Sequence, residues 1–174
     1  MEFLDQIKNL IPDYAKDIRL NIDSTIARSS LDPNDALCAA LAAAFAAKST
    51  VITNIIRNAG VLPAVEMHAA LTAASLMGMN NAWYPYVEMT GDADLKTQPA
   101  QLRMTAYATH GGVDKRKFEL YALAASVIGK CHFCIESHYA LLKQEGMTTQ
   151  QLRDVGRIAA VVNAAAQVIA AEGK

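Results

Sequence analysis

Apolar residues recur at spacings of three and four along almost the whole chain, and no segment of useful length alternates apolar and polar positions. Spacings of three and four place apolar side chains on one face of an α-helix, whereas alternation is typical of a half-buried strand. The hydrophobic pattern therefore predicts an all-α fold, a helical bundle whose segments are separated by Pro and Gly residues.

Capping and helix-breaking residues predict where these segments end. Asp32 has the place of an N-cap before Pro33 at a first helical position, and Gly60 that of a left-handed terminator. Thr148 and Gln151 have the spacing of a capping box. We expect helices at about 3–11, 14–22, 33–48, 51–60, 63 onward with a break near 78 or 80, 100–108, 114–128, 131–144 and 149–171.

Two helical segments resemble each other. The stretch "LCAALAAAFAAK" (37–48) lies over "ELYALAASVIGK" (119–130) at an offset of 82, with five identical positions. Alanine-rich helices also match by chance, so an internal duplication and a chance similarity both stay open. If the chain is duplicated, the first copy has no cysteines after Lys48 and the site described below is single.

The composition favours one domain that associates with itself. A chain of 174 residues is long enough for one compact core and short for two, so we expect a single domain covering 1–174. The hydrophobic content is 52% and the charged content only 19%. Surplus apolar surface of this kind is usually hidden in subunit contacts, which predicts an oligomer.

The charge balance and the N-terminus exclude several classes of partner. With a net charge of -1, no global field favours nucleic acid or an anionic membrane. The longest unbroken apolar run, 36–47, is too short to span a bilayer. The first residues lack the pattern of a secretory signal, so we expect a cytoplasmic protein in which the three cysteines form no structural disulfide framework.

The stretch "GKCHFCIESH" carries the candidate chemistry. Cys131, Cys134 and His138 lie at helical spacing on one stripe, and Gly129 ends the preceding helix. Cys131 then falls in the first turn of the next helix, where free N–H groups and the helix dipole favour a thiolate. A redox dithiol with a neighbouring imidazole as base is one interpretation. A zinc site with Glu119 or His132 as a fourth ligand is another.

Glu119 is the candidate partner of His138. On one continuous helix the nineteen intervening steps would separate the two residues by about 28 Å at ~1.5 Å per residue. Gly129 lies ten residues after Glu119 and nine before His138, so a chain that folds back there brings both to the same level of adjacent helices. We therefore predict a relay from Glu119 to His138, which a shallow bend at Gly129 would exclude.

Glu119, an apolar helix, Cys131-X-X-Cys134 and His138 in this order resemble the alkylhydroperoxidase D family of the carboxymuconolactone decarboxylase-like superfamily. The stretches "GVDKRKFELYALAASVIGKC" and "MGMNNAWY" extend the resemblance, which covers the whole chain. It implies an all-helical homotrimer, a single domain of this type over 1–174, and an antioxidant disulfide reductase with weak peroxidase activity.

The resemblance also implies a role for each residue of the motif. Cys134 is the nucleophile, activated through His138 and Glu119, that passes through a sulfenic acid. Cys131 is the resolving thiol and proton donor, forms the Cys131–Cys134 redox disulfide, and is the more accessible thiol for a mixed disulfide. In the best-known members a histidine directly precedes the second cysteine, but Phe133 stands there and His132 follows the first cysteine. His132 is therefore a candidate without an assigned role.

For partners, the resemblance implies a lipoyl group on a 2-oxoacid dehydrogenase component, kept reduced by dihydrolipoamide dehydrogenase, as the reducing substrate. Electrons then pass to a peroxiredoxin, with no tightly bound cofactor and no metal. Two alternatives remain: a decarboxylase acting on a muconolactone-like acid, which has no use for a dithiol, and a zinc-stabilised helical binding module.

Overall fold

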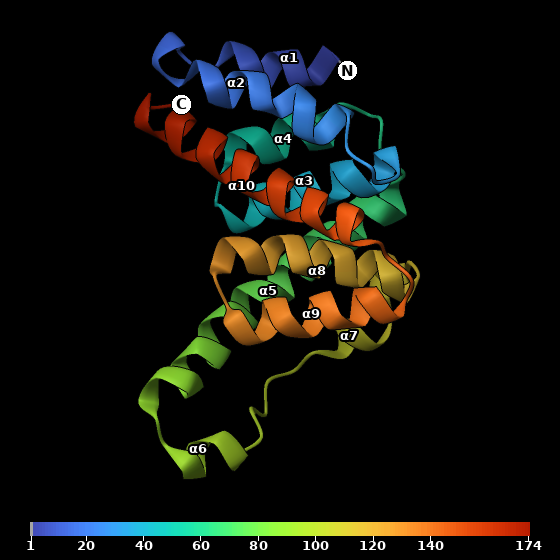
Figure 1. The fold of residues 1–174 in the computed structure, drawn as a ribbon, viewed down its shortest axis with the longest axis vertical. Helices are drawn as coiled ribbons and strands as arrows, with labels where there is room; N and C mark the ends of the chain where they lie inside the picture. The colour runs from blue at the N-terminus through green and yellow to red at the C-terminus, as the bar shows by residue number, and fades with distance from the viewer. Residues whose placement is uncertain (1) are drawn as a thin grey trace.

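Helices α3 (Pro33–Ala46) and α8 (Lys115–Gly129) run through the centre of the molecule and are covered by α5 (Ala64–Thr90) and α10 (Thr149–Ala171) (Figure 1). This computed structural model describes residues 2–174, and every regular element in that range is a helix. The predicted all-α fold is confirmed. One cluster of buried apolar side chains extends from Phe3 to Ile169 and joins the helices.

The alanine content explains how the two central helices are buried. Ten consecutive residues of α3, from Asp35 to Ala44, and nine of α8, from Phe118 to Ser126, are buried. A helix that is apolar on every face is stable only where other helices surround it. Small side chains let those neighbours approach closely, so α3 and α8 can pack against each other and against the outer helices.

The other elements of residues 2–174 are mostly shorter. They are α1 (Glu2–Asn9), the 3-10 turn η1 (Asp13–Ala15), α2 (Lys16–Ile22), the π-helical turn η2 (Asp23–Ala27), α4 (Thr50–Asn58), α6 (Ala93–Thr97), α7 (Thr105–Ala108), the 3-10 turn η3 (His110–Gly112) and α9 (His132–Gln144).

The helix boundaries repeat at the offset of 82 found in the sequence. Shifted by 82, α3, α4 and α5 would cover 115–128, 132–140 and 146–172, close to the observed α8, α9 and α10. The residues at the helix ends repeat as well: Asp32 and Asp114 are side-chain N-caps, Lys48 and Lys130 have left-handed φ of 61° and 53°, and Ser49 and Cys131 are side-chain N-caps of the following helix. Shared capping chemistry at three matching places favours the internal duplication over chance.

Helix α5 differs from the sequence-based expectation, because it continues through Gly78 and Asn80 without a break. Met77 and Asn80 on this stretch are buried, and their packing offsets the cost of roughly 1 kcal/mol that an internal glycine carries. The short helix expected at 100–108 is also wrong in extent. It is reduced to α7, and the unpredicted α6 precedes it, capped by the Asp92 side chain.

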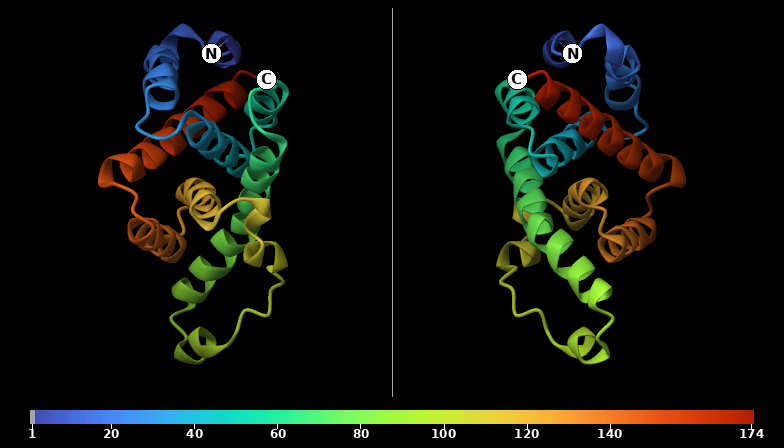
Figure 2. Two further views of the ribbon diagram at one scale, coloured as in Figure 1. Left: turned by 90° about the vertical axis from the view of Figure 1, so that its right-hand side faces the viewer. Right: turned by 90° about the vertical axis from the view of Figure 1, so that its left-hand side faces the viewer.

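The end of α5, helix α6 and the segment 98–104 form an arm that projects from the rest of the molecule (Figure 2). The arm exposes large apolar side chains: Tyr86 is 53% exposed, Met89 79% and Leu102 39%. Its two sides are α5 and an irregular stretch without regular hydrogen bonding, and only the first part of α5 belongs to the core. In Figure 1 the arm, with α6, lies at the lower end of the molecule.

Helix α10 is long and apolar enough to cross a membrane by length and composition alone. In the fold its apolar face packs on α3 and α8, and Leu152, Val155 and Ile158 on that face are buried. Thr148 and Gln151 form the predicted capping box at its start. These contacts are those of a core helix.

Gly129 allows the closest approach of α5 to the end of α8. A Cβ at this position would lie 2.1 Å from Nδ2 and 2.3 Å from Cγ of Asn81, whose Nδ2 donates to the Ala125 carbonyl at 3.2 Å. We predict that Gly129→Ala displaces Asn81 and lowers the free energy of unfolding by about 1–3 kcal/mol, measured by urea denaturation. Gly78→Ala is the matched control: nothing lies within 4 Å of its Cβ, so it should raise the free energy by up to ~1 kcal/mol. Equal effects of both variants would contradict the steric explanation.

Asp154 on α10 accepts hydrogen bonds from Ser30 in the loop before α3. Burial opposes its ionisation, but bonds from the Ser30 backbone and side chain, both 2.8 Å, and from Arg157 and Arg153 lower its pKa to about 2. The folded pKa lies below the unfolded one, so this stabilisation is present above about pH 4 and is lost as the pH falls toward 2. We predict that Asp154→Asn lowers the free energy of unfolding by roughly 2 kcal/mol at pH 7 and much less at pH 2.5, measured by urea denaturation. A difference independent of pH would contradict this.

Candidate active site

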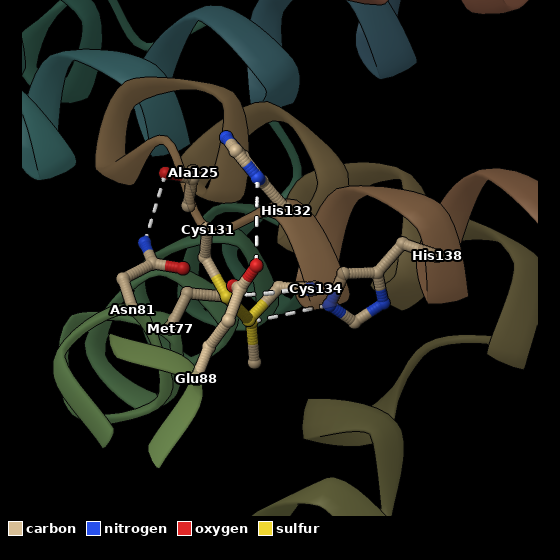
Figure 3. The surroundings of a disulfide bond; sticks show 8 residues. All are labelled: Met77, Asn81, Glu88, Ala125, Cys131, His132, Cys134 and His138. Carbon is tan, nitrogen blue, oxygen red and sulfur yellow. Dashed lines mark hydrogen bonds and ion pairs between the residues drawn. A yellow bond between two sulfur atoms is a disulfide. The ribbon is translucent and has the colours of Figure 1, made fainter. Parts of the chain in front are cut away.

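The two cysteines of the motif lie where the chain turns from α8 into α9. Lys130 has a left-handed φ of 53°, and Cys131 follows as the N-cap of α9, its Sγ accepting from the backbone N–H of Cys134 at 3.3 Å. Cys131 and Cys134 are joined by a disulfide, with Cα atoms 5.3 Å apart (Figure 3). The sequence predicts Cys131 in the first turn of α9, whereas the structure shows it one position earlier, as the N-cap. Its sulfur still accepts a hydrogen bond from a backbone N–H group of that first turn.

The predicted fold-back near Gly129 is confirmed, because α9 returns along α8. It brings Glu119 and His138 together: Oε2 of Glu119 lies 2.5 Å from Nδ1 of His138. The two side chains are 1% and 7% exposed, so the pair is screened from water. The geometry that a relay between Glu119 and His138 requires is therefore present.

Glu119 has a second partner that the sequence did not suggest. The Tyr107 hydroxyl on α7 donates to Oε1, so that each carboxylate oxygen accepts one hydrogen bond. Burial raises the pKa of Glu119, but the bonds from His138 and Tyr107 outweigh burial and hold the pKa below its usual value. The carboxyl is therefore ionised at neutral pH.

On its other side, the His138 ring faces Met77. Nε2 of His138 lies 3.2 Å from the Met77 sulfur, which is fully buried in α5 (Figure 3). With Nδ1–H directed at Glu119, Nε2 is the nitrogen that can take up or release a proton. Met77 is a weak acceptor, so it can hold the ring in place when Nε2 is protonated without competing strongly for the proton.

A pocket of about 200 Å³ opens at this place. It is lined by Asn80, Tyr84, Met104, Tyr107, Phe133, Cys134, Ser137 and His138. Cys134 and His138 therefore face one space, whereas Cys131 is fully buried and is not among the lining residues. The expectation that Cys131 is the more accessible thiol is wrong for this structure, because its N-cap position places the sulfur beneath the turn, while Cys134, 3% exposed, reaches the pocket.

His132 does not join the site. Its ring is 83% exposed and lies 3.9 Å from the Glu88 carboxylate, directed away from Cys134 (Figure 3). Phe133, directly before the second cysteine of the motif, stacks on Tyr84 with ring centroids 4.4 Å apart. Phe133 and Tyr84 thus form one wall of the pocket. His132 places no imidazole near the two sulfurs.

Several residues around the site were missed by sequence reasoning. Met77, Asn80, Asn81 and Tyr84 follow the spacing i, i+3, i+4, i+7, so they occupy one face of α5 that turns toward α8 and α9. That spacing was visible in "MGMNNAWY" and could have identified the face. Tyr107 gave no such signal, because it lies in a short helix of an irregular segment.

The remaining candidate groups lie apart from this pocket. Within residues 2–174, no three His, Cys, Asp or Glu side chains are close enough to hold a metal ion together. Burial raises the pKa of Cys38 to about 12, although the Tyr121 side chain acts to lower it. Cys38 is therefore an unreactive buried thiol in the core, as expected from its alanine-rich helix.

Comparison with known proteins agrees with these features. A model of the Carboxymuconolactone decarboxylase family matches residues 93–173, which include both cysteines, Glu119 and His138. A protein of Rhodospirillum centenum named Alkyl hydroperoxide reductase AhpD is 44% identical over 171 residues, covering 97% of this chain and 91% of that protein.

Two further proteins with the same name show similar agreement. The one from Hyphomonas neptunium is 41% identical over 171 residues, which cover 97% of this chain and 94% of the relative. The one from Bradyrhizobium is 39% identical over 170 residues, which cover 97% of this chain and 93% of the relative. Similarity at this level over nearly the full length of both chains shows that this chain belongs to the AhpD family.

Proposed function

We propose that the protein is a cytoplasmic antioxidant enzyme that reduces hydroperoxides and protein disulfides through the Cys131/Cys134 dithiol. One observation carries this proposal: a Cys-X-X-Cys disulfide at a helix start adjoins a pocket that also holds His138 of a buried Glu119–His138 pair. The relatives named alkyl hydroperoxide reductase support a peroxide as the oxidant. The chemistry uses only side chains of this chain and no tightly bound cofactor.

In the reduced enzyme, Nε2 of His138 takes the proton of the Cys134 thiol, and Glu119 stabilises the resulting imidazolium. The Cys134 thiolate attacks one peroxide oxygen. A sulfur–oxygen bond forms, the oxygen–oxygen bond breaks, and the alkoxide leaves as an alcohol after taking the proton from His138. Cys134 is then a sulfenic acid, two electrons more oxidised than the thiol.

Cys131 completes the oxidative half-reaction. Its sulfur attacks the sulfenic sulfur of Cys134, the disulfide forms, and hydroxide leaves as water with the proton that the Cys131 thiol supplies. The structure contains this disulfide, and the Cys134 N–H group lies at the Cys131 sulfur, where it can stabilise a thiolate. One peroxide and two thiols thus become one alcohol, one water and one disulfide.

We propose that the reductant is a lipoyl group carried on a 2-oxoacid dehydrogenase component and kept reduced by dihydrolipoamide dehydrogenase. One lipoyl thiolate attacks the Cys134 sulfur, which lines the pocket, and Cys131 leaves as a thiolate next to the start of α9. The second lipoyl thiol then closes the lipoyl disulfide and releases Cys134. A small pocket suits a dithiol at the end of a flexible arm better than a folded protein surface.

The reduced dithiol can also pass electrons to a partner peroxiredoxin by the same exchange at Cys134. Such a partner would present its disulfide on a mobile segment, since Cys134 is only 3% exposed. We further propose that the molecule is a homotrimer in which the projecting arm contacts a neighbouring subunit. The exposed Tyr86, Met89 and Leu102 side chains support this assembly.

The activity is tested by following NADH oxidation with lipoamide, lipoamide dehydrogenase and tert-butyl hydroperoxide. We expect turnover in the wild type and a loss of at least 100-fold, on the order of a missing nucleophile, in Cys134→Ser. Cys38→Ala is the matched control and should keep its activity, because Cys38 lies buried outside the pocket. No turnover in any variant, together with stoichiometric zinc in the purified protein, would favour the binding-module alternative instead.

The assembly is tested by light scattering after gel filtration. The chain has a mass of 18.7 kDa, so a trimer has 3 × 18.7 = 56.1 kDa. We expect this mass for the wild type and for Leu20→Glu, at the opposite end of the molecule from the arm (Figure 1). Met89→Glu places a charge on the exposed arm and should lower the mass toward that of one chain. A monomeric wild type would exclude the trimer.

A further inference from the structure

We propose that Tyr107 is a positioning residue of the thiol site, whose hydroxyl holds the Glu119 carboxylate in the orientation that His138 requires. The hydroxyl donates to Oε1 of Glu119, and Nδ1 of His138 lies 2.5 Å from Oε2 of the same carboxylate. The inference rests on the proposed function, because it assigns a role in that same reaction. It extends the relay from two elements, α8 and α9, to a third, α7.

The burial of Glu119 makes this hydrogen bond consequential. The Glu119 side chain is 1% exposed, so water cannot replace a donor that is lost. A buried carboxylate is stable in its ionised form only when donors satisfy its oxygens. In the described part of the chain, Tyr107 and His138 are the hydrogen-bonding partners of this carboxylate, one for each oxygen.

Few other charges act on this carboxylate. From its own helix, Lys115 exerts a weaker attraction, and its ammonium group is 3.6 Å from the Glu145 carboxylate. From α5, the neighbours are uncharged: Met77, which contacts His138, and Tyr84, which lines the pocket. No charged group other than His138 lies within ion-pair distance of Glu119 among residues 2–174. The hydroxyl of Tyr107 therefore has no substitute nearby.

The Tyr107 ring is held by packing that does not depend on its hydroxyl. It lies edge-on against Phe118 with ring centroids 5.5 Å apart and an interplanar angle of 89°. The segment that follows is pressed against α5: Gly111 has a φ of 61°, and a Cβ there would lie 2.9 Å from the Ala69 Cα. Tyr107→Phe should thus keep the ring in place and remove only the hydrogen bond.

The hydroxyl acts on the proton equilibrium of the relay. A donor bonded to the ionised form of an acid favours that form, so its removal makes the coupled Glu119/His138 pair hold its proton to higher pH. His138 can accept the Cys134 proton only after the pair has released one. The low-pH limb of activity should therefore move upward when Tyr107 loses its hydroxyl.

The test compares wild type, Tyr107→Phe and Tyr139→Phe between pH 4.5 and 9. Tyr139 is 37% exposed on α9, outside the pocket, and is the matched control for loss of a hydroxyl. We measure kcat/KM in the lipoamide-coupled assay at each pH. In Tyr107→Phe the low-pH limb should move up by about one pH unit, so that the loss of kcat/KM relative to wild type is about tenfold at the acid end and becomes smaller as the pH rises.

A second measurement does not need turnover. The ring-proton NMR signal of His138, assigned with His138→Gln, is followed against pH in the disulfide form. Its midpoint should rise by about one pH unit in Tyr107→Phe and stay at the wild-type value in Tyr139→Phe. If Tyr107→Phe does not fold, 3-fluorotyrosine at position 107 keeps the packing, strengthens the donor and should lower the midpoint.

The outcomes separate this inference from the proposed function. Coincident pH profiles and midpoints in wild type and Tyr107→Phe overturn the role of Tyr107, even if all variants are active. A wild type without peroxide turnover overturns the proposed function, while the NMR midpoint still decides whether Tyr107 controls the relay. A uniform loss of activity at every pH with an unchanged midpoint assigns Tyr107 a purely structural role and also overturns the inference.

Discussion

A carboxylate that is buried and ionised must receive hydrogen bonds from the protein, and Glu119 sets this requirement at the centre of the molecule. Its donors, His138 on α9 and Tyr107 on α7, are far apart in the sequence and meet only in the folded chain. The chain must reverse after α8 so that His138 reaches Oε2, and the segment after the arm must return so that Tyr107 reaches Oε1. The pocket beside the disulfide is the space that these two returns enclose.

Much of this arrangement could be predicted from the sequence, for reasons of local chemistry. Caps at Asp32 and Thr148 mark real helix starts, and the near-equal distances of Glu119 and His138 from Gly129 give the correct pairing. The rest depends on contacts between distant segments. Local rules favour a break in α5 at Gly78, and the burial of Met77 and Asn80 beside it explains why the helix continues.

The relative burial of the two sulfurs could not be predicted from the sequence either. A helix start favours a thiolate at Cys131 whatever surrounds it, so the sequence indicates reactivity but not access. Access depends on which sulfur faces the pocket, and the structure assigns that place to Cys134. Cys131 is left with a backbone N–H group at its sulfur, the environment that a departing thiolate needs. In the proposed exchange, attack would therefore occur at Cys134 and departure at Cys131, because only Cys134 faces the pocket.

Because of the repeat at an offset of 82, each residue of the candidate site has a counterpart in the first half of the chain. The positions that match Glu119, Cys131, Cys134 and His138 in the first copy are Leu37, Ser49, Ile52 and Ile56. Three of these four are apolar and buried, so the same turn between helices there serves as hydrophobic core. The first half of the repeat therefore supplies packing where the second half carries the candidate site, as two copies of one hairpin would if only one had kept polar residues at these positions.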